Sequence, residues 1–233
     1  MLQKTIKLLN DFTYLFFPHT CEGCGTDIPD INRSLCASCL FQLPETGFIN
    51  TKDNPVEKKF YGQIKLEAAG SAYYFTKSSL LQRLIKQLKY RGNKEAGRFL
   101  GKQLGKQLAD SDRFKDVDCI VPLPLNPKKE RKRGYNQAAL IAEGIAAIWP
   151  RPILLNAVER KIFTETQTHK NRINRWQSMQ GVFALKEEAA IRNKHVLLVD
   201  DIITTGATLE ACGETILSAE GSRLSIATIA YTI

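Results

Sequence analysis

The stretch HVLLVDDIITTGATL, residues 195–209, decides the fold of this chain. The four apolar residues at 196–199 are typical of a strand that is buried on both faces of a parallel sheet. Asp200 and Asp201 follow at the expected carboxyl end, where open α/β sheets bind their ligands. The turn at 204–208 is followed by a further apolar segment, which we expect to be a helix. The free N–H groups of its first turn could then bind an anionic ligand. Carboxylates that accept hydrogen bonds from vicinal hydroxyls, beside such an anion site, fit a ribose that carries a 5′-phosphate.

Apolar segments with strand and helix character alternate along the rest of the chain. Strands are expected at 65–75, 118–121 and 223–233, and helices at 78–90, 99–108, 140–148 and 207–219. This alternation predicts an α/β fold in which helices cover both faces of a parallel sheet. The polar residues 44–62 are expected to form a linker between a small module at 1–43 and a larger domain at 63–233.

The charge of the chain favours anionic partners. Its 233 residues carry a formal net charge of +9, which suits phosphates or nucleic acid. No apolar run reaches the roughly 18 residues that a membrane span needs. The N-terminal MLQKTIKLLNDFTYLFF contains an acid and no small-residue cleavage site follows it, so we expect a short amphipathic helix rather than a signal peptide. The chain is therefore expected to be cytoplasmic, with reduced thiols. The apolar face of the helix would comprise Ile6, Leu9, Phe12 and Phe16.

Four cysteines form two C-x-x-C pairs within CEGCGTDIPDINRSLCASC, residues 21–39. The two-residue spacing lets both sulfurs of a pair reach one metal, and two pairs complete a tetrahedral four-thiolate site. Two disulfides or a redox-active C-x-x-C are the alternatives, and both fit a reducing compartment poorly. We predict a structural Zn²⁺ whose binding supplies the folding energy of this small segment. Its ligands would be Cys21, Cys24, Cys36 and Cys39.

Two basic segments are candidates for binding anions. The first follows the strand at 118–121 and is expected to be a proline-stiffened loop, whose arginines suit bidentate phosphate contacts. The second, residues 159–176, places an aromatic ring among cations, a combination that can stack on the bases of single strands. A solvated loop and a core-packed Trp176 are the alternatives. The candidates for anion binding are Lys128, Lys129, Arg131 and Arg133, and those for nucleic acid are Lys132, Tyr135, Lys170, Arg172, Arg175 and Trp176.

The segment VLLVDDIITTGAT, residues 196–208, resembles at every position the signature with which type I phosphoribosyltransferases bind phosphoribosyl pyrophosphate (PRPP). The resemblance implies that Asp200 and Asp201 hold the ribose 2′- and 3′-hydroxyls and are the candidate catalytic residues. It also implies that the loop after them holds the 5′-phosphate, that residues 128–133 face the pyrophosphate, and that Mg²⁺ accompanies PRPP. The implied PRPP-binding residues are Asp200, Asp201, Ile202, Ile203, Thr204, Thr205, Gly206, Ala207 and Thr208.

The order of motifs over nearly the whole chain resembles the ComF family, which includes the GntX-like proteins. The cysteine pairs come first, and LKYRGNKEAGRFLG (88–101), residues 121–142, residues 164–183 and the PRPP signature follow. Typical members have Arg-Gly-Phe-Asn-Gln where this chain has Tyr135 in place of the Phe, a change that keeps the ring. Residues 167–172 resemble the family's mobile segment, which folds over a bound ligand.

Two functions follow from this resemblance. The first is a PRPP-binding protein of natural transformation, which binds single-stranded DNA in the cytoplasm of competent bacteria and passes it to helicases or recombination proteins. The alternative is an active phosphoribosyltransferase that uses an unidentified acceptor and is unrelated to DNA. The sequence shows no recognisable acceptor-binding hood, and fold alone does not choose between the two.

Overall fold

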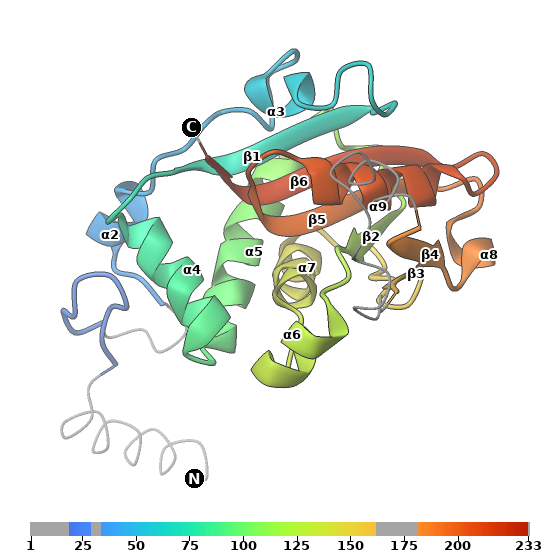
Figure 1. Cartoon of the computed structure of the whole chain (residues 1–233). Helices are drawn as coiled ribbons and strands as arrows, with labels where there is room; N and C mark the ends of the chain where they lie inside the picture. The colour runs from blue at the N-terminus through green and yellow to red at the C-terminus, as the bar shows by residue number, and fades with distance from the viewer. Residues whose placement is uncertain (1–18, 29–33, 162–180, 233) are drawn as a thin grey trace, which may run out of the picture.

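A four-stranded parallel sheet lies at the centre of the molecule (Figure 1). The computed structural model describes residues 19–28, 34–161 and 181–232. The strand order is β1–β6–β5–β2, and each neighbouring pair runs parallel, as the partners Val199 and Ala227 illustrate. The carboxyl ends of all four strands therefore lie along one edge. The strands are β1 (Ala68–Phe75), β2 (Cys119–Pro122), β5 (His195–Ile203) and β6 (Arg223–Thr232).

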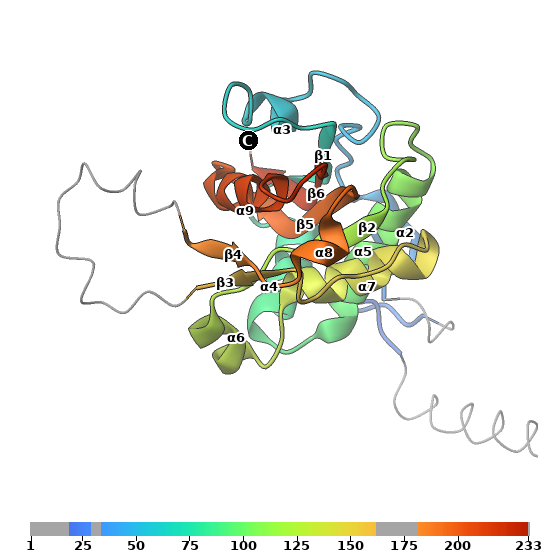
Figure 2. The same cartoon turned by 90° about the vertical axis from the view of Figure 1, so that its right-hand side faces the viewer.

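Helices cover both faces of the sheet because alternate residues of its apolar strands point to opposite sides. Leu197 and Val199 of β5 belong to one buried core, whereas Val196 and Leu198 belong to the other. The first core packs on α4 (Leu80–Tyr90), α5 (Lys94–Ala109) and α7 (Gln137–Ile148). The second packs on α3 (Pro55–Lys58), α9 (Ala207–Leu217) and the antiparallel pair β3 (Val158–Arg160) and β4 (Phe183–Leu185). Figure 2 shows α9 on one side of the sheet and α5 and α7 on the other.

Small residues allow α5 and α7 to approach closely. A Cβ added to Gly101 of α5 would overlap the carbonyl oxygen of Ile141, and one added to Gly144 of α7 would overlap the carbonyl oxygen of Arg98. Glycine at these positions therefore brings the two helix backbones into contact. Among the described residues, no helix is long and apolar enough to cross a membrane.

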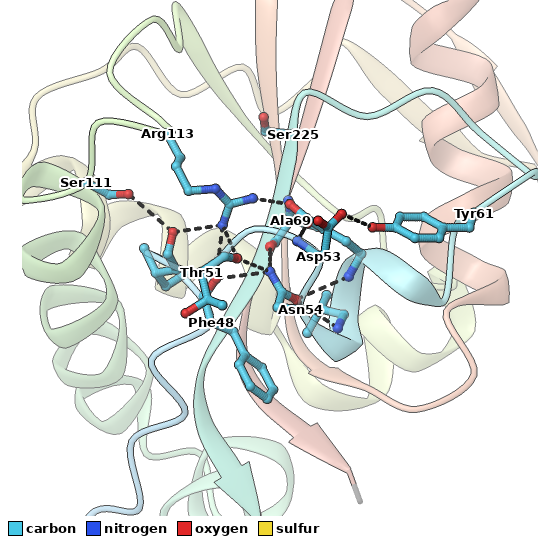
Figure 3. Close-up of polar contacts among 12 residues, drawn as sticks. Phe48, Thr51, Asp53, Asn54, Tyr61, Ala69, Ser111, Arg113 and Ser225 are labelled. Atoms are coloured by element: carbon cyan, nitrogen blue, oxygen red, sulfur yellow. Dashed lines mark hydrogen bonds and ion pairs between the residues drawn. The ribbon is translucent and has the colours of Figure 1, made fainter.

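The segment 44–62, which the sequence predicts to be a linker, instead packs against the sheet. Asn54 donates from Nδ2 to the carbonyls of Phe48 (3.1 Å) and of Ala69 in β1 (2.7 Å), as Figure 3 shows. Arg113 donates to the carbonyls of Phe48, Ile49 and Thr51 and forms an ion pair with Glu57. Val56 and Phe60 are buried in the core beside α9. The polar composition of this segment thus reflects a hydrogen-bonded covering of the sheet rather than a free tether.

The expected elements are present, and two differences from the expectation bear on the candidate site. The basic segment after β2, predicted to be a loop, forms a helix, α6 (Pro127–Arg133). Asn126 caps it by accepting from the Lys128 N–H, proline occupies a first-turn position, and Gly134 ends it with a φ of 80°. Strand β5 continues to Ile203, so the two acids lie within the strand rather than after it. The amphipathic face expected at 6–16 lies outside the described residues. Within the part of the chain that the structure describes, the remaining helices are α2 (Ala37–Phe41) and α8 (Glu188–Ile191).

Candidate functional site

The two acids of β5 differ in their surroundings. Asp201 is buried, with 8% of its side chain exposed, and its Oδ1 lies 2.9 Å from the Lys89 Nζ at the end of α4. The Asp201 N–H donates to Asp200 Oδ1 at 2.8 Å, so the carboxylate of Asp200 lies against the backbone of its neighbour. Asp201 is therefore not open to solvent at the strand end, because Lys89 in the last turn of α4 lies against it.

The pKa of Asp200 is raised by its surroundings. It keeps part of its surface exposed, but dense packing around it raises its pKa to about 8, and the charge of Asp201 contributes to this shift. The cations of Lys89 and Arg160 oppose the shift. The raised pKa favours the protonated form of Asp200, which can donate a hydrogen bond as well as accept one. A half-neutralised pair also repels an anionic ligand less than two free carboxylates would.

The turn after the acids forms an open helix N-terminus. Gly206 is the N-cap of α9 with a φ of 89°, and it provides no side-chain cap for the N–H groups of the first turn. The Ala207 N–H has a long contact of 3.5 Å to the Thr205 hydroxyl. The side chains of Thr204 and Thr205 are exposed. N–H groups and hydroxyls therefore gather at the positive end of the α9 dipole, a few residues from the acids, and can bind a phosphate.

Helix α6 adds positive charge at the same edge of the sheet, because it follows the carboxyl end of β2, the neighbour of β5. Lys128, Lys129, Arg131 and Lys132 are exposed. Arg133 is half-buried, donates to Gln137 Oε1 at 2.6 Å, and places its guanidinium 5.6 Å from the centre of the Tyr90 ring. The four exposed cations are thus free to meet an anion, whereas Arg133 also holds the end of α6 against α4 and α7.

Two aromatic rings, those of Tyr90 and Tyr135, contact residues at this edge. Tyr135, a nucleic-acid candidate, is half-buried, and its hydroxyl donates to the carbonyl of Leu88 in α4. Tyr90, for which the sequence predicted no role, is 74% exposed beside Arg133. The sequence alone assigned no role to Lys89 or Tyr90. The segment LKYRGN could have indicated both, since it places a cation and an aromatic ring directly after the last apolar residue of an expected helix. The candidates Lys170, Arg172, Arg175 and Trp176 lie outside the described residues.

The four cysteines of the N-terminal module come together as predicted. Their sulfur atoms all lie within 4.8 Å of one another, and those of Cys24 and Cys36 are 3.7 Å apart. A tetrahedral zinc–thiolate site, with bonds of about 2.3 Å, has sulfurs about 3.8 Å apart. The N–H groups of Gly23 and Cys36 point at Cys21 Sγ, at 3.4 and 3.2 Å, and such donors stabilise a thiolate. The cluster can therefore hold a metal ion, and its donor set fits Zn²⁺.

The four-cysteine cluster is joined to α4. Arg83 donates to the carbonyl of Gly23 at 2.8 Å, and Asn93, which follows α4, donates to Glu22 at 2.8 Å. Cys21 and Cys39 belong to the same buried core as Leu81 of that helix. Helix α4 thus contacts the cysteine module near its beginning and the acid pair at its end.

Comparisons with known proteins agree with this geometry. Residues 151–232 match the model of the phosphoribosyl transferase domain. The chain is 29% identical to competence protein F of Haemophilus influenzae, over 83% of this chain and 89% of that protein. It is 25% identical to competence protein ComFC of Bacillus subtilis (84% and 77%) and 27% identical to DNA utilization protein YhgH of Salmonella typhi (59% and 61%). The predicted fold class is confirmed, a type I phosphoribosyltransferase-like parallel sheet with a four-cysteine module. These matches support the resemblance of the chain to the ComF family of competence-related proteins and identify a phosphoribosyltransferase-type domain in it.

Proposed function

We propose that this chain binds PRPP at the carboxyl edge of β5. The acid pair Asp200–Asp201 would take the ribose 2′- and 3′-hydroxyls, and the N-terminus of α9 would take the 5′-phosphate. The observation that carries the proposal is that only a few residues separate the acids, in β5, from the start of α9, where Gly206 is the N-cap and no side chain caps the first N–H groups. The exposed cations of α6 lie at the same edge and would face the pyrophosphate.

Two metal ions belong to this proposal. Zn²⁺ would occupy the four-cysteine cluster, where it would hold the module in shape. Within the described ranges, this cluster is the only group of three or more His, Cys, Asp or Glu residues with metal-binding spacing. Mg²⁺ would therefore arrive with PRPP, bound mainly by the oxygens of the ligand, and would neutralise part of the pyrophosphate charge.

The proposed cellular role is the handling of single-stranded DNA during natural transformation, in the cytoplasm. The names of the relatives, competence protein and DNA utilization protein, support a role with DNA. The net charge of +9 and the four exposed cations of α6 support electrostatic binding of the phosphate backbone of DNA. Helicases or recombination proteins would be the partners that receive the strand.

Catalytic turnover is a second candidate, favoured by the raised pKa of Asp200. A carboxyl group with a pKa of about 8 can exchange a proton at physiological pH, as general acid–base catalysis requires. In such a transfer the C1–O bond would break, pyrophosphate would leave with the bonding electrons, and the acceptor nucleophile would bond to C1. Release of pyrophosphate upon mixing with PRPP and an acceptor would distinguish an enzyme from a binding protein.

Calorimetric titration of PRPP with Mg²⁺ tests the binding proposal. Replacement of both acids, Asp200→Asn with Asp201→Asn, keeps their shape, removes the negative charge of the pair and replaces one oxygen of each side chain by an amide group that only donates, so the ribose hydroxyls lose acceptors. We expect PRPP affinity to fall by roughly a hundredfold or more. The control Asp110→Asn with Asp112→Asn makes the same change of charge at two exposed residues after α5 and should bind as the wild type does. Unchanged affinity in the first variant would show that the ribose is bound elsewhere.

A further inference from the structure

Lys89 is a charged residue at the acid pair that the proposed function leaves without a role. It lies in the last turn of α4, its side chain is 21% exposed, and its Nζ is 2.9 Å from Asp201 Oδ1. The nearby cations Lys86 and Arg91 are both exposed. Lys89 thus differs from the other cations of its segment, because its ammonium is turned toward a buried carboxylate.

The position of Lys89 is fixed by the packing of α4. The apolar face of the helix, Leu81, Leu84, Ile85 and Leu88, is buried in the core. The carbonyl of Leu88 accepts a hydrogen bond from the hydroxyl of Tyr135. A side chain on so rigid an element can orient its partner with little loss of conformational entropy on ligand binding.

We propose that Lys89 is a positioning residue of the ribose subsite: its ammonium holds Asp201 through Oδ1 and leaves Oδ2 to accept a ribose hydroxyl. The inference rests on the proposed binding of PRPP. The ammonium also cancels the charge of Asp201, which would otherwise repel the phosphates of the ligand. Lys89 thereby lets a buried acid bind a sugar that carries anionic groups.

Binding of three probes to three variants tests this role. The probes are PRPP with Mg²⁺, ribose 5-phosphate, and inorganic pyrophosphate, each titrated into the full chain by calorimetry. Lys89→Met should lower the affinity for PRPP and for ribose 5-phosphate by the same factor, roughly tenfold to a hundredfold, and leave pyrophosphate binding unchanged. Lys89→Arg keeps the charge and should restore most of the loss. The control Lys86→Met removes an exposed cation from the same helix and should bind all three probes as the wild type does.

Lys89→Met leaves Asp201 without a counter-charge and can therefore impair folding. The double variant Lys89→Met with Asp201→Asn leaves no unpaired charge, and its PRPP affinity should equal that of Asp201→Asn alone. A further loss in the double variant would show that Lys89 acts independently of Asp201 and would overturn the proposal.

Two results with Lys89→Met would also overturn it. One is wild-type affinity for ribose 5-phosphate, and the other is a loss confined to PRPP and pyrophosphate, since Lys89 would then contact the pyrophosphate directly. A failure of the proposed function is recognised separately, because the wild type itself would then bind neither PRPP nor ribose 5-phosphate.

Discussion

At Gly206 the backbone adopts a φ of 89°, a conformation that glycine adopts readily and other residues rarely do. A Cβ at this position would lie 3.2 Å from the ring of buried Phe60, closer than side chains normally pack, so the ring or the start of α9 would have to shift. We expect Gly206→Ala to lower the free energy of unfolding by about 1–2 kcal/mol and to weaken PRPP binding further than this destabilisation explains. Chemical denaturation and calorimetry measure the two effects.

Gly47→Ala separates backbone strain from the loss of the binding site. Gly47 has a φ of 73°, and nothing lies within 4 Å of its added Cβ. This control should lose a similar amount of stability and keep its PRPP affinity. If both variants kept wild-type affinity, the N-terminus of α9 would not be the phosphate site.

The raised pKa of Asp200 predicts a pH dependence of stability. The folded chain keeps the Asp200 proton up to a pH of about 8, whereas the unfolded chain releases it near its ordinary pKa of about 4. This carboxyl group therefore lowers the stability of the fold progressively as the pH rises from about 4 to about 8. Asp200→Asn should remove this decline, so its free energy of unfolding relative to the wild type should rise by about 1–2 kcal/mol or more over that range. A difference that stays constant with pH would contradict the assignment.

Single residues show how far the sequence predicts the site. Asp200, Asp201 and Gly206 were predicted because they are adjacent in one motif, and the strand and helix around them were predicted from apolar periodicity. Lys89 was not predicted as a partner of Asp201, since 112 positions separate the two residues along the chain. The raised pKa of Asp200 could not be predicted either, because it depends on how densely the folded chain packs around this carboxyl group, with the charge of Asp201 adding to the shift and cations on two other elements opposing it.

At the scale of elements, α6 is the part of the proposed DNA surface that can be tested alone. Its four exposed cations, Lys128, Lys129, Arg131 and Lys132, would contact phosphates, whereas Arg133 is left in place because it donates to Gln137. Replacing these four by Ala should weaken single-stranded DNA binding for all sequences. If all four contact phosphates, the slope of log K against log salt should fall by about 3, at roughly 0.7 per contact. Fluorescence anisotropy at several salt concentrations measures this slope.

A matched variant controls for net charge. Lys102→Ala and Lys106→Ala on α5, with Lys115→Ala and Lys194→Ala, also remove four exposed positive charges. This set should alter the salt slope much less than the α6 set does. Equal effects of the two sets would mean that general positive charge, rather than α6, binds the strand.

Elements also show where reasoning from composition was insufficient. The basic segment was interpreted as a loop because of its prolines, although an Asn-Pro start and a Gly end are signals of a helix boundary. Residues 44–62 were interpreted as a linker because they are polar, yet Asn54 bonds this segment to β1, Arg113 binds its backbone carbonyls, and its side chains Val56 and Phe60 are buried. Hydrogen bonds of this kind leave no periodic pattern in a sequence.

At the scale of the whole molecule, the cysteine module and the domain share one core through α4. We expect about one Zn²⁺ per chain in protein purified under reducing conditions, as measured by elemental analysis. Cys21→Ser should lower this content and speed hydrogen exchange first in residues 19–43 and then at the start of α4, which contacts Gly23. The parallel sheet should stay folded.

Cys119→Ala is the control for the loss of a cysteine. Cys119 is buried in the sheet, away from the four-cysteine cluster, so this variant should keep about one Zn²⁺ per chain. A fully folded wild-type chain without metal would contradict the structural role of the cluster.

A crystal structure with PRPP and Mg²⁺ tests the central claim most directly. The account predicts ribose hydroxyls within about 3.2 Å of the Asp200 and Asp201 carboxylates and the 5′-phosphate at the first N–H groups of α9. The pocket of about 530 Å³ that is lined by Lys52, Lys65 and Arg113 among others should stay free of PRPP. PRPP bound in that pocket, or bound away from Asp200, would contradict the account.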